Sequence, residues 1–132
     1  MATATGTFDV LTGDETTIEE TDGGNRLTHA TGTQHFTGAI EGDGSVDWLM
    51  CYQPDGDARL VGLQRISGSI DGQTGTVVID AVGQHHGKAS SARWHVIEGT
   101  GTGELTGIRG VGSFEAPGGP TVSYRLDYEI ES

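Results

Sequence analysis

Val122-Ser-Tyr-Arg-Leu-Asp-Tyr-Glu-Ile130 is the stretch that decides the fold of this 132-residue chain. Its apolar and aromatic residues stand at every second position, with charged or hydroxylated residues between them. Successive side chains of a β-strand point to opposite faces of the sheet. The alternation therefore predicts a strand with one buried face and one face in water.

The same two-residue period recurs along the chain and is interrupted by glycine-rich segments. Three further clear rows are Val46, Trp48, Met50, Tyr52, then Leu60, Gly62, Gln64, Ile66, then Ile108, Gly110, Gly112, Phe114. Weaker rows run through Thr3–Val10, Leu27–Ile40, Thr76–Val82 and Ala89–Ile97. No stretch has a convincing helical period; Asp14–Asp22 is the best helical candidate, but it is polar on all sides and is predicted to be a loop.

Turn signals between the rows predict hairpins. They are Pro54-Asp55-Gly56-Asp57, Asp43-Gly44 and Asp71-Gly72. Glycine supplies 23 of the 132 residues, more than twice its usual share of about 7%. Glycine inside a strand marks a bulge or bend that lets a sheet coil. We therefore predict an all-β fold with one domain over residues 1–132, a single closed antiparallel barrel of about eight strands, whose interior holds packed side chains or one small ligand.

The net charge limits the classes of partner that we expect, and the cysteine content indicates the cellular compartment. Seven basic and nineteen acidic residues give a net charge of −12, which repels nucleic-acid phosphates and anionic lipids. We expect neither nucleic acid nor membrane as a partner. Residues 1–10 contain no signal-peptide pattern, and the single Cys51 excludes an intrachain disulfide and suits a reducing compartment. The predicted location is the cytoplasm.

Six segments carry a family resemblance that extends from Thr5 to Ile130. They are Phe36–Gly44, Trp48–Tyr52, Asp55-Gly56, Val61–Arg65, Trp94–Gly110 and Leu126–Tyr128. Together they resemble an uncharacterised bacterial domain family that is grouped with the allene oxide cyclase-like β-barrels. Relatives with this architecture enclose a reactive intermediate in an apolar cavity and steer its ring closure or coupling. The chain departs from the family pattern at Gln64, where a Glu is usual, and at Asp80-Ala81, where a Gln-His pair is usual.

The bulky row of each strand provides the candidate ligand-binding residues. If these rows face inward, they line the barrel with aromatic and weakly polar side chains, which suit an apolar small molecule. The predicted substrate-binding residues are Trp48, Met50, Tyr52, Gln64, Trp94, Phe114 and Tyr128. The alternative is a packed core, which uses the same residues.

Asp80 and Tyr124 are the predicted catalytic residues. Asp80 interrupts the apolar run Val77–Val82, and a carboxylate that faces a barrel interior can act as a general acid or base. Tyr124 supplies a hydroxyl on the inward row of its strand. In the alternative, the immediate neighbours of Asp80 face the interior, and Asp80 itself faces solvent or a subunit interface.

The sequence contains no persuasive metal or cofactor motif. His85 and His86 are adjacent, so on a strand they point to opposite faces and cannot bind one ion unless the backbone turns there. The glycine-rich segment Gly99–Gly107 lacks the spacing of a nucleotide-binding loop. We expect no metal and no cofactor.

These features predict two alternative functions and, separately, a homo-oligomer. The first is a small-molecule cyclase or isomerase that acts on an apolar intermediate inside the barrel, as similar small barrels do in natural-product pathways. The second is a non-catalytic binding barrel for a hydrophobic metabolite. Val61 and Leu63 stand opposite the inward row of their strand, so that strand is apolar on both faces. This predicts a homo-oligomer, a dimer or a trimer.

Overall fold

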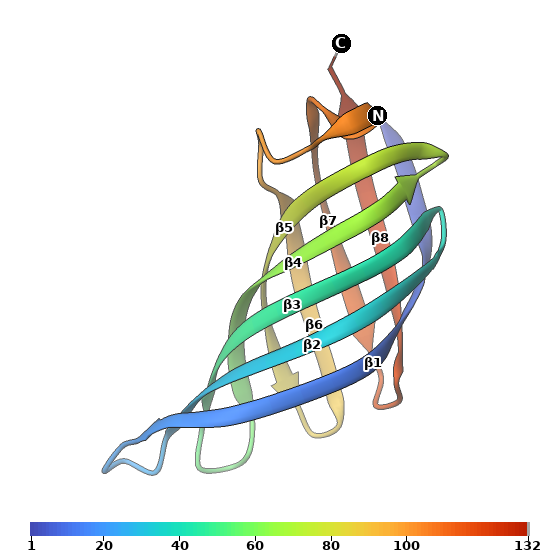
Figure 1. Cartoon of the computed structure of the whole chain (residues 1–132). Helices are drawn as coiled ribbons and strands as arrows, with labels where there is room; N and C mark the ends of the chain where they lie inside the picture. Colours follow the sequence, from blue (N-terminus) through green and yellow to red (C-terminus); the bar gives the residue numbers. More distant parts are fainter. Residues whose placement is uncertain (132) are drawn as a thin grey trace.

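The computed structural model describes residues 1–131 and shows eight antiparallel strands closed into one barrel (Figure 1). The strands are β1 (Ala2–Glu20), β2 (Arg26–Gly38), β3 (Ile40–Tyr52), β4 (Ala58–Ile70), β5 (Gln73–His86), β6 (Ala89–Val96), β7 (Ile108–Ala116) and β8 (Thr121–Ile130), with the short 3-10 turn η1 (Gly103–Leu105) before β7. Each strand pairs with its sequence neighbours, and β1 pairs with β8 to close the barrel. The predicted closed antiparallel barrel is confirmed. Within residues 1–131, no helix has the length and apolar character needed to cross a membrane.

Two of the three predicted turns connect strands. Pro54–Asp57 joins β3 to β4, and Asp71 with Gly72 joins β4 to β5 with positive φ at both residues. The predicted turn at Asp43-Gly44 is wrong, because both residues lie inside β3. Glycine serves a different purpose there: a side chain on Gly44 would fall on the Phe36 ring inside the barrel.

The predicted loop at Asp14–Asp22 is also wrong for most of its length, because β1 continues to Glu20. Pairing with β8 ends at Asp9, and from Thr12 onward β1 pairs with β2 alone. The β1–β2 hairpin therefore extends beyond the barrel, at the lower left of Figure 1. Most of this part of β1 is exposed, so the one-sided apolar pattern that identifies a buried strand is missing.

Trp94 lies at the centre of the core, and aromatic rings surround it. Its ring centroid is 5.8 Å from that of Tyr124 and 6.1 Å from that of Phe114. Phe8 and Phe36 each lie 6.4 Å away, and all of these residues are buried. These separations are those of aromatic rings in direct contact. Side chains in mutual contact thus fill the barrel interior at this level.

A chain of hydrogen bonds fixes the polar groups of this core. The Trp94 indole N–H donates to Gln64 Oε1 at 2.7 Å, and the Gln64 amide donates to Gln34 Oε1 at 2.9 Å. Both glutamines are at most 3% exposed. A buried polar group without a partner costs about 1–3 kcal/mol, so these bonds allow two amides to lie among aromatic rings.

The Tyr124 hydroxyl ties β8 to the connection between β2 and β3. It donates to the Thr37 carbonyl at 2.9 Å and accepts from the Ile40 N–H at 2.8 Å. Burial raises the pKa of Tyr124, so the hydroxyl keeps the proton that it donates. A side chain on Gly6 would fall on the Tyr124 ring and the Thr37 carbonyl, which explains the glycine at this close approach.

We predict that Tyr124→Phe destabilises the protein by about 1–3 kcal/mol, because it leaves the Ile40 N–H without its acceptor. Urea denaturation followed by circular dichroism measures the change. Tyr52→Phe is the matched control, since the Tyr52 hydroxyl contacts side chains, the Met50 sulfur at 3.8 Å and the Glu15 carboxylate, and does not serve as the acceptor of a backbone N–H. Equal losses in the two variants would show that the Tyr124 hydroxyl does not anchor the barrel.

Candidate functional site

A groove on the outer face of β2–β5 is the strongest candidate site. It has a volume of about 700 Å³ and is named the outer groove below. Its outward-pointing apolar side chains are Leu49, Val61, Leu63 and Val82, and its charged or titratable side chains are His29, Asp47, Arg65 and Asp80. Trp48, Gly62 and Ala81, which belong to the inward rows, complete its lining.

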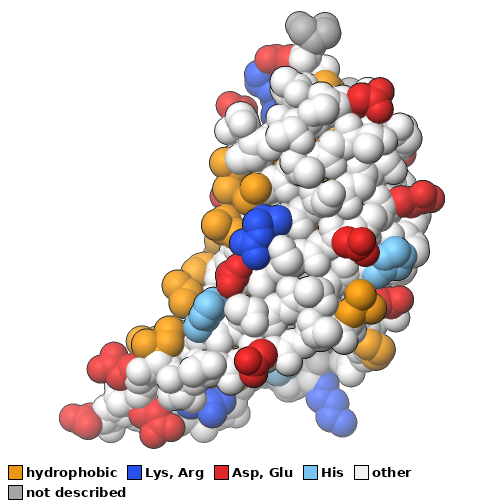
Figure 2. Space-filling view, in the orientation of Figure 1, with side chains coloured by type: hydrophobic (Ala, Val, Ile, Leu, Met, Phe, Trp, Pro, Cys, Tyr) orange, Lys and Arg blue, Asp and Glu red, His pale blue; other side chains and the backbone are white. Residues whose placement is uncertain are grey.

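The apolar part of the outer groove follows from strand register. Leu49 stands opposite Val61, and Val61 stands opposite Val82, so three apolar residues on three strands form one row. Leu63 is the next outward residue of β4. These four side chains are 42–54% exposed, and Figure 2 shows hydrophobic side chains gathered along the left margin of the barrel. An apolar cluster of this kind on a sheet face in water indicates a binding surface.

A charged cluster borders the groove on β2–β4. The Asp47 carboxylate accepts a hydrogen bond from Arg65 Nη2 at 2.7 Å and lies 3.0 Å from His29 Nε2. The bond from Arg65, followed by that from His29, lowers the pKa of Asp47 below its ordinary value of 3.8. Asp47 is therefore a fixed negative charge between two cationic or titratable groups.

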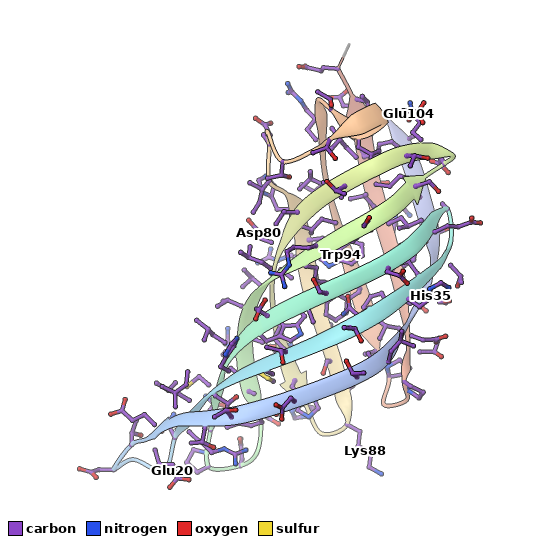
Figure 3. All side chains as sticks on the ribbon, viewed as in Figure 1. Glu20, His35, Asp80, Lys88, Trp94 and Glu104 are labelled. Atoms are coloured by element: carbon purple, nitrogen blue, oxygen red, sulfur yellow. The ribbon has the colours of Figure 1, made fainter. Side chains whose placement is uncertain are left out.

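Asp80 lies in the β5 part of the groove and faces outward. Its Oδ2 is 3.6 Å from His95 Nδ1, and 42% of its side chain is exposed. Figure 3 shows Asp80 at the outside of the barrel. Its neighbours Ile79 and Ala81 are fully buried, so the alternative orientation from the sequence is the one observed. The inward-facing carboxylate is wrong, because β5 directs its continuous apolar row to the core; a catalytic role for Asp80 in the outer groove stays a prediction.

The predicted substrate-binding residues do not converge on one space. Gln64, Trp94 and Phe114 are buried in mutual contact or hydrogen bonding, as the packed-core alternative describes. Trp48 is partly exposed; its ring packs on Phe114 with centroids 6.0 Å apart, while the residue also lines the outer groove. Tyr124, the second predicted catalytic residue, has its hydroxyl bonded to backbone groups.

The remaining three predicted residues lie toward the two ends of the barrel. Tyr128 donates to the Asp71 carboxylate, and burial with that bond raises the pKa of Tyr128 to about 12. Tyr52, whose hydroxyl contacts Met50, lies under the Arg26 guanidinium at 4.7 Å. Burial, with the Glu15 carboxylate beside it, raises the pKa of Tyr52 to about 12. Both tyrosines therefore remain neutral hydrogen-bond donors at neutral pH.

The histidines do not form a metal centre. His85 bonds to Ser90 Oγ at 2.7 Å, and His86 bonds to the Asp57 carboxylate at 2.7 Å. Over residues 1–131, no three His, Cys, Asp or Glu side chains are grouped closely enough to hold a metal ion.

Sequence reasoning missed the site residues His29, Asp47, Leu49, Arg65 and Val82. The available signal for this site was that Val61 and Leu63 make their strand apolar on both faces. To find the site residues on the neighbouring strand, one needs the strand register, which sets Leu49 beside Val61 and Asp47 beside Leu63. Strand periodicity gives the face of each residue but not its partner on the next strand.

Comparison with known proteins supports the fold. A family model described as "Protein of unknown function (DUF3224)" matches residues 4–128. A crystal structure of a protein of unknown function from that family, from Shewanella oneidensis MR-1, is 24% identical with a TM-score of 0.83. The match covers 100% of this chain and 99% of the other. No curated protein matches the chain significantly.

We predict that Arg65→Ala raises the pKa of Asp47 toward 3.8, because Arg65 is the main cause of its depression. A carboxyl-detected NMR titration measures this value. A depressed folded-state pKa stabilises the protein above the unfolded-state pKa, and that contribution is lost as pH falls through the folded-state pKa. Arg109→Ala is the control, since Arg109 bonds to Glu131 elsewhere. An unchanged Asp47 titration in Arg65→Ala would contradict the assigned ion pair.

Proposed function

The chain belongs to the DUF3224 family, and from this premise we propose that it binds an apolar small molecule in the outer groove. The observation that carries the proposal is the row of exposed apolar side chains, Leu49, Val61 and Val82, in a groove of about 700 Å³. Small-molecule sites typically occupy about 300–1,000 Å³, with an apolar lining and a few polar groups that fix orientation.

The polar groups of the outer groove are placed to orient a ligand. Asp47, His29 and Arg65 form one hydrogen-bonded cluster, and Asp80 lies 3.6 Å from His95 on the neighbouring strand. Leu63 stands between Asp47 and Asp80 in strand register. A ligand with an apolar body and a polar substituent at its edge fits this arrangement.

A second copy of the chain is the competing occupant of this face. The predicted dimer or trimer would cover Val61 and Leu63 and remove their exposed area from water. Each copy carries a net charge of −12, however, which opposes self-association. We therefore propose the small molecule as the occupant and treat self-association as an outcome of the test.

A cyclase or isomerase activity is the second candidate. It is favoured by Asp80 and His95, a carboxylate and an imidazole 3.6 Å apart beside an apolar groove. Such a pair can move one proton between positions of a bound substrate. In this proposal the chemistry takes place on the outer face, since packed rings fill the interior around Trp94.

We also propose that the barrel belongs with the allene oxide cyclase-like superfamily. The support is the closed eight-stranded antiparallel topology, together with the sequence segments that resemble that group. This proposal concerns the common ancestry of the barrels. It does not change the proposed binding site, which is the outer groove.

We predict that Val61→Ser with Leu63→Ser weakens binding of the neutral fluorescent probe Nile red by on the order of tenfold, because about 1–2 kcal/mol of apolar contact is lost. Fluorescence titration measures the affinity. Leu11→Ser with Ile18→Ser is the matched control, since these apolar side chains are at least as exposed as Val61 and Leu63 but lie on the β1 extension.

Native mass spectrometry of the same samples counts the subunits. A monomer whose probe binding falls only in the Val61/Leu63 variant supports the proposal. Equal weakening in both variants would reject the outer groove as the site. A stable dimer or trimer that dissociates in the Val61/Leu63 variant would instead assign this face to a second copy.

A further inference from the structure

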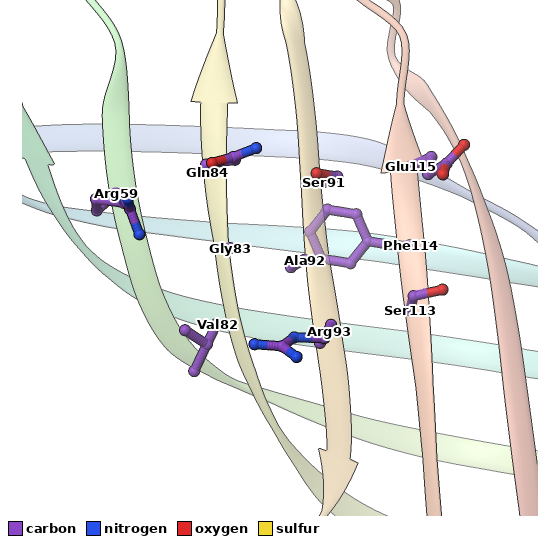
Figure 4. A pocket seen from close by; sticks show the side chains of 10 residues that line it. All are labelled: Arg59, Val82, Gly83, Gln84, Ser91, Ala92, Arg93, Ser113, Phe114 and Glu115. Atoms are coloured by element: carbon purple, nitrogen blue, oxygen red, sulfur yellow. The ribbon is translucent and has the colours of Figure 1, made fainter.

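A second pocket, separate in chemistry from the outer groove, lies on the outer face of β4–β7 and is named the arginine pocket below. It has a volume of about 390 Å³ (Figure 4). Its polar lining consists of Arg59, Gln84, Ser91, Arg93, Ser113 and Glu115. Val82 is the one residue that lines both the arginine pocket and the outer groove.

The two arginines of this pocket have no carboxylate partner within residues 1–131. Arg65, Arg109 and Arg125 each lie within 4.0 Å of a carboxylate, whereas Arg59 and Arg93 do not; Arg26 also lacks such a pair but lies over the Tyr52 ring. This is notable in a chain with nineteen acidic residues and seven basic ones. Two guanidinium groups that form no ion pair with the described carboxylates therefore face the same hollow, although acidic residues are abundant in the chain.

Strand register shows that both arginines can reach one ligand. Arg59 on β4 stands opposite Gln84 on β5, which stands opposite Ser91 on β6, and Arg93 is two residues from Ser91. Two strand spacings and two residues along a strand place the Cα atoms about 12 Å apart. Two long side chains can span this distance. In Figure 4 both arginines extend toward the space beside Val82.

Neutral donors complete the pocket. The Gln84 amide and the hydroxyls of Ser91 and Ser113 line it alongside the guanidinium groups. Guanidinium presents paired N–H donors that match the oxygens of a phosphate or carboxylate, and hydroxyl or amide donors commonly add to such sites. Glu115 is the one acidic residue of the lining, and its negative charge repels a bound anion.

We propose that the arginine pocket binds a doubly charged oxyanion, either a phosphate group or a dicarboxylate, between Arg59 and Arg93. The site does not depend on the function proposed for the outer groove. Its ligand is anionic, whereas that of the outer groove is apolar. If either the anion or the apolar ligand fails to bind, binding of the other can still be measured.

The test is a ¹H–¹⁵N NMR titration with inorganic phosphate in one arm and succinate in the other, at constant ionic strength. We expect shifts of the backbone amides of Gln84, Ser91 and Arg93 and of the Gln84 side-chain amide. Arg59→Gln and Arg93→Gln should each weaken binding at least about fivefold, since each removes charged donors. Glu115→Gln should strengthen binding, because it removes the opposing charge.

Arg109→Gln is the matched control, because it removes the same charge from the chain at a distant site. Saturation by phosphate alone assigns a phosphate-bearing ligand, and saturation by succinate alone assigns a dicarboxylate. No saturable shift in either arm overturns the proposal. Equal weakening in Arg109→Gln also overturns it, since binding would then follow net charge and not the pocket. Unchanged amide spectra elsewhere in each variant confirm that the barrel is folded.

Discussion

The packing of aromatic rings around Trp94 is the interaction on which the rest of this structure depends. A barrel of eight strands leaves an interior only wide enough for side chains or one small ligand. Here Phe8, Phe36, Phe114 and Tyr124 surround the indole, and Gln64 accepts its N–H. Large side chains fill this space only where the neighbouring positions are small. Gly62, for example, leaves the room that the Trp48 ring occupies, and Gly44 leaves room for the Phe36 ring.

A filled interior moves the candidate chemistry to the outer surface. Outward residues of a barrel in water are expected to be polar, and most of the outer rows here are. The row through Leu49, Val61 and Val82 departs from this rule across three adjacent strands, and ion pairs border it. Next to it, Arg59 and Arg93 remain without carboxylate partners among the described residues. The outer groove and the arginine pocket meet at Val82. Both candidate sites therefore include residues of β4 and β5.

Sequence periodicity predicted the fold well, because it reports the local alternation that burial imposes on each strand. The rows containing Tyr124, Ile66 and Phe114 all face the core as expected. The pattern misled at Asp14–Asp22, where β1 leaves the barrel and no core imposes alternation. It could not predict the candidate site, because Leu49 and Val82 are 33 residues apart (82 − 49) and meet only through two strand registers. Nor could it decide whether the inward aromatics enclose a ligand or one another, which depends on how their rings interlock.

Methyl NMR with Nile red tests most directly whether the ligand lies outside a filled barrel. In protein labelled at Ile, Leu and Val methyls, saturating probe should shift the signals of the outward residues Leu49, Val61, Leu63 and Val82. The signals of the buried residues Ile66, Ile79 and Leu126 should stay in place. Large shifts confined to the buried methyls would contradict this account, because they would mean that the interior opens to admit the ligand.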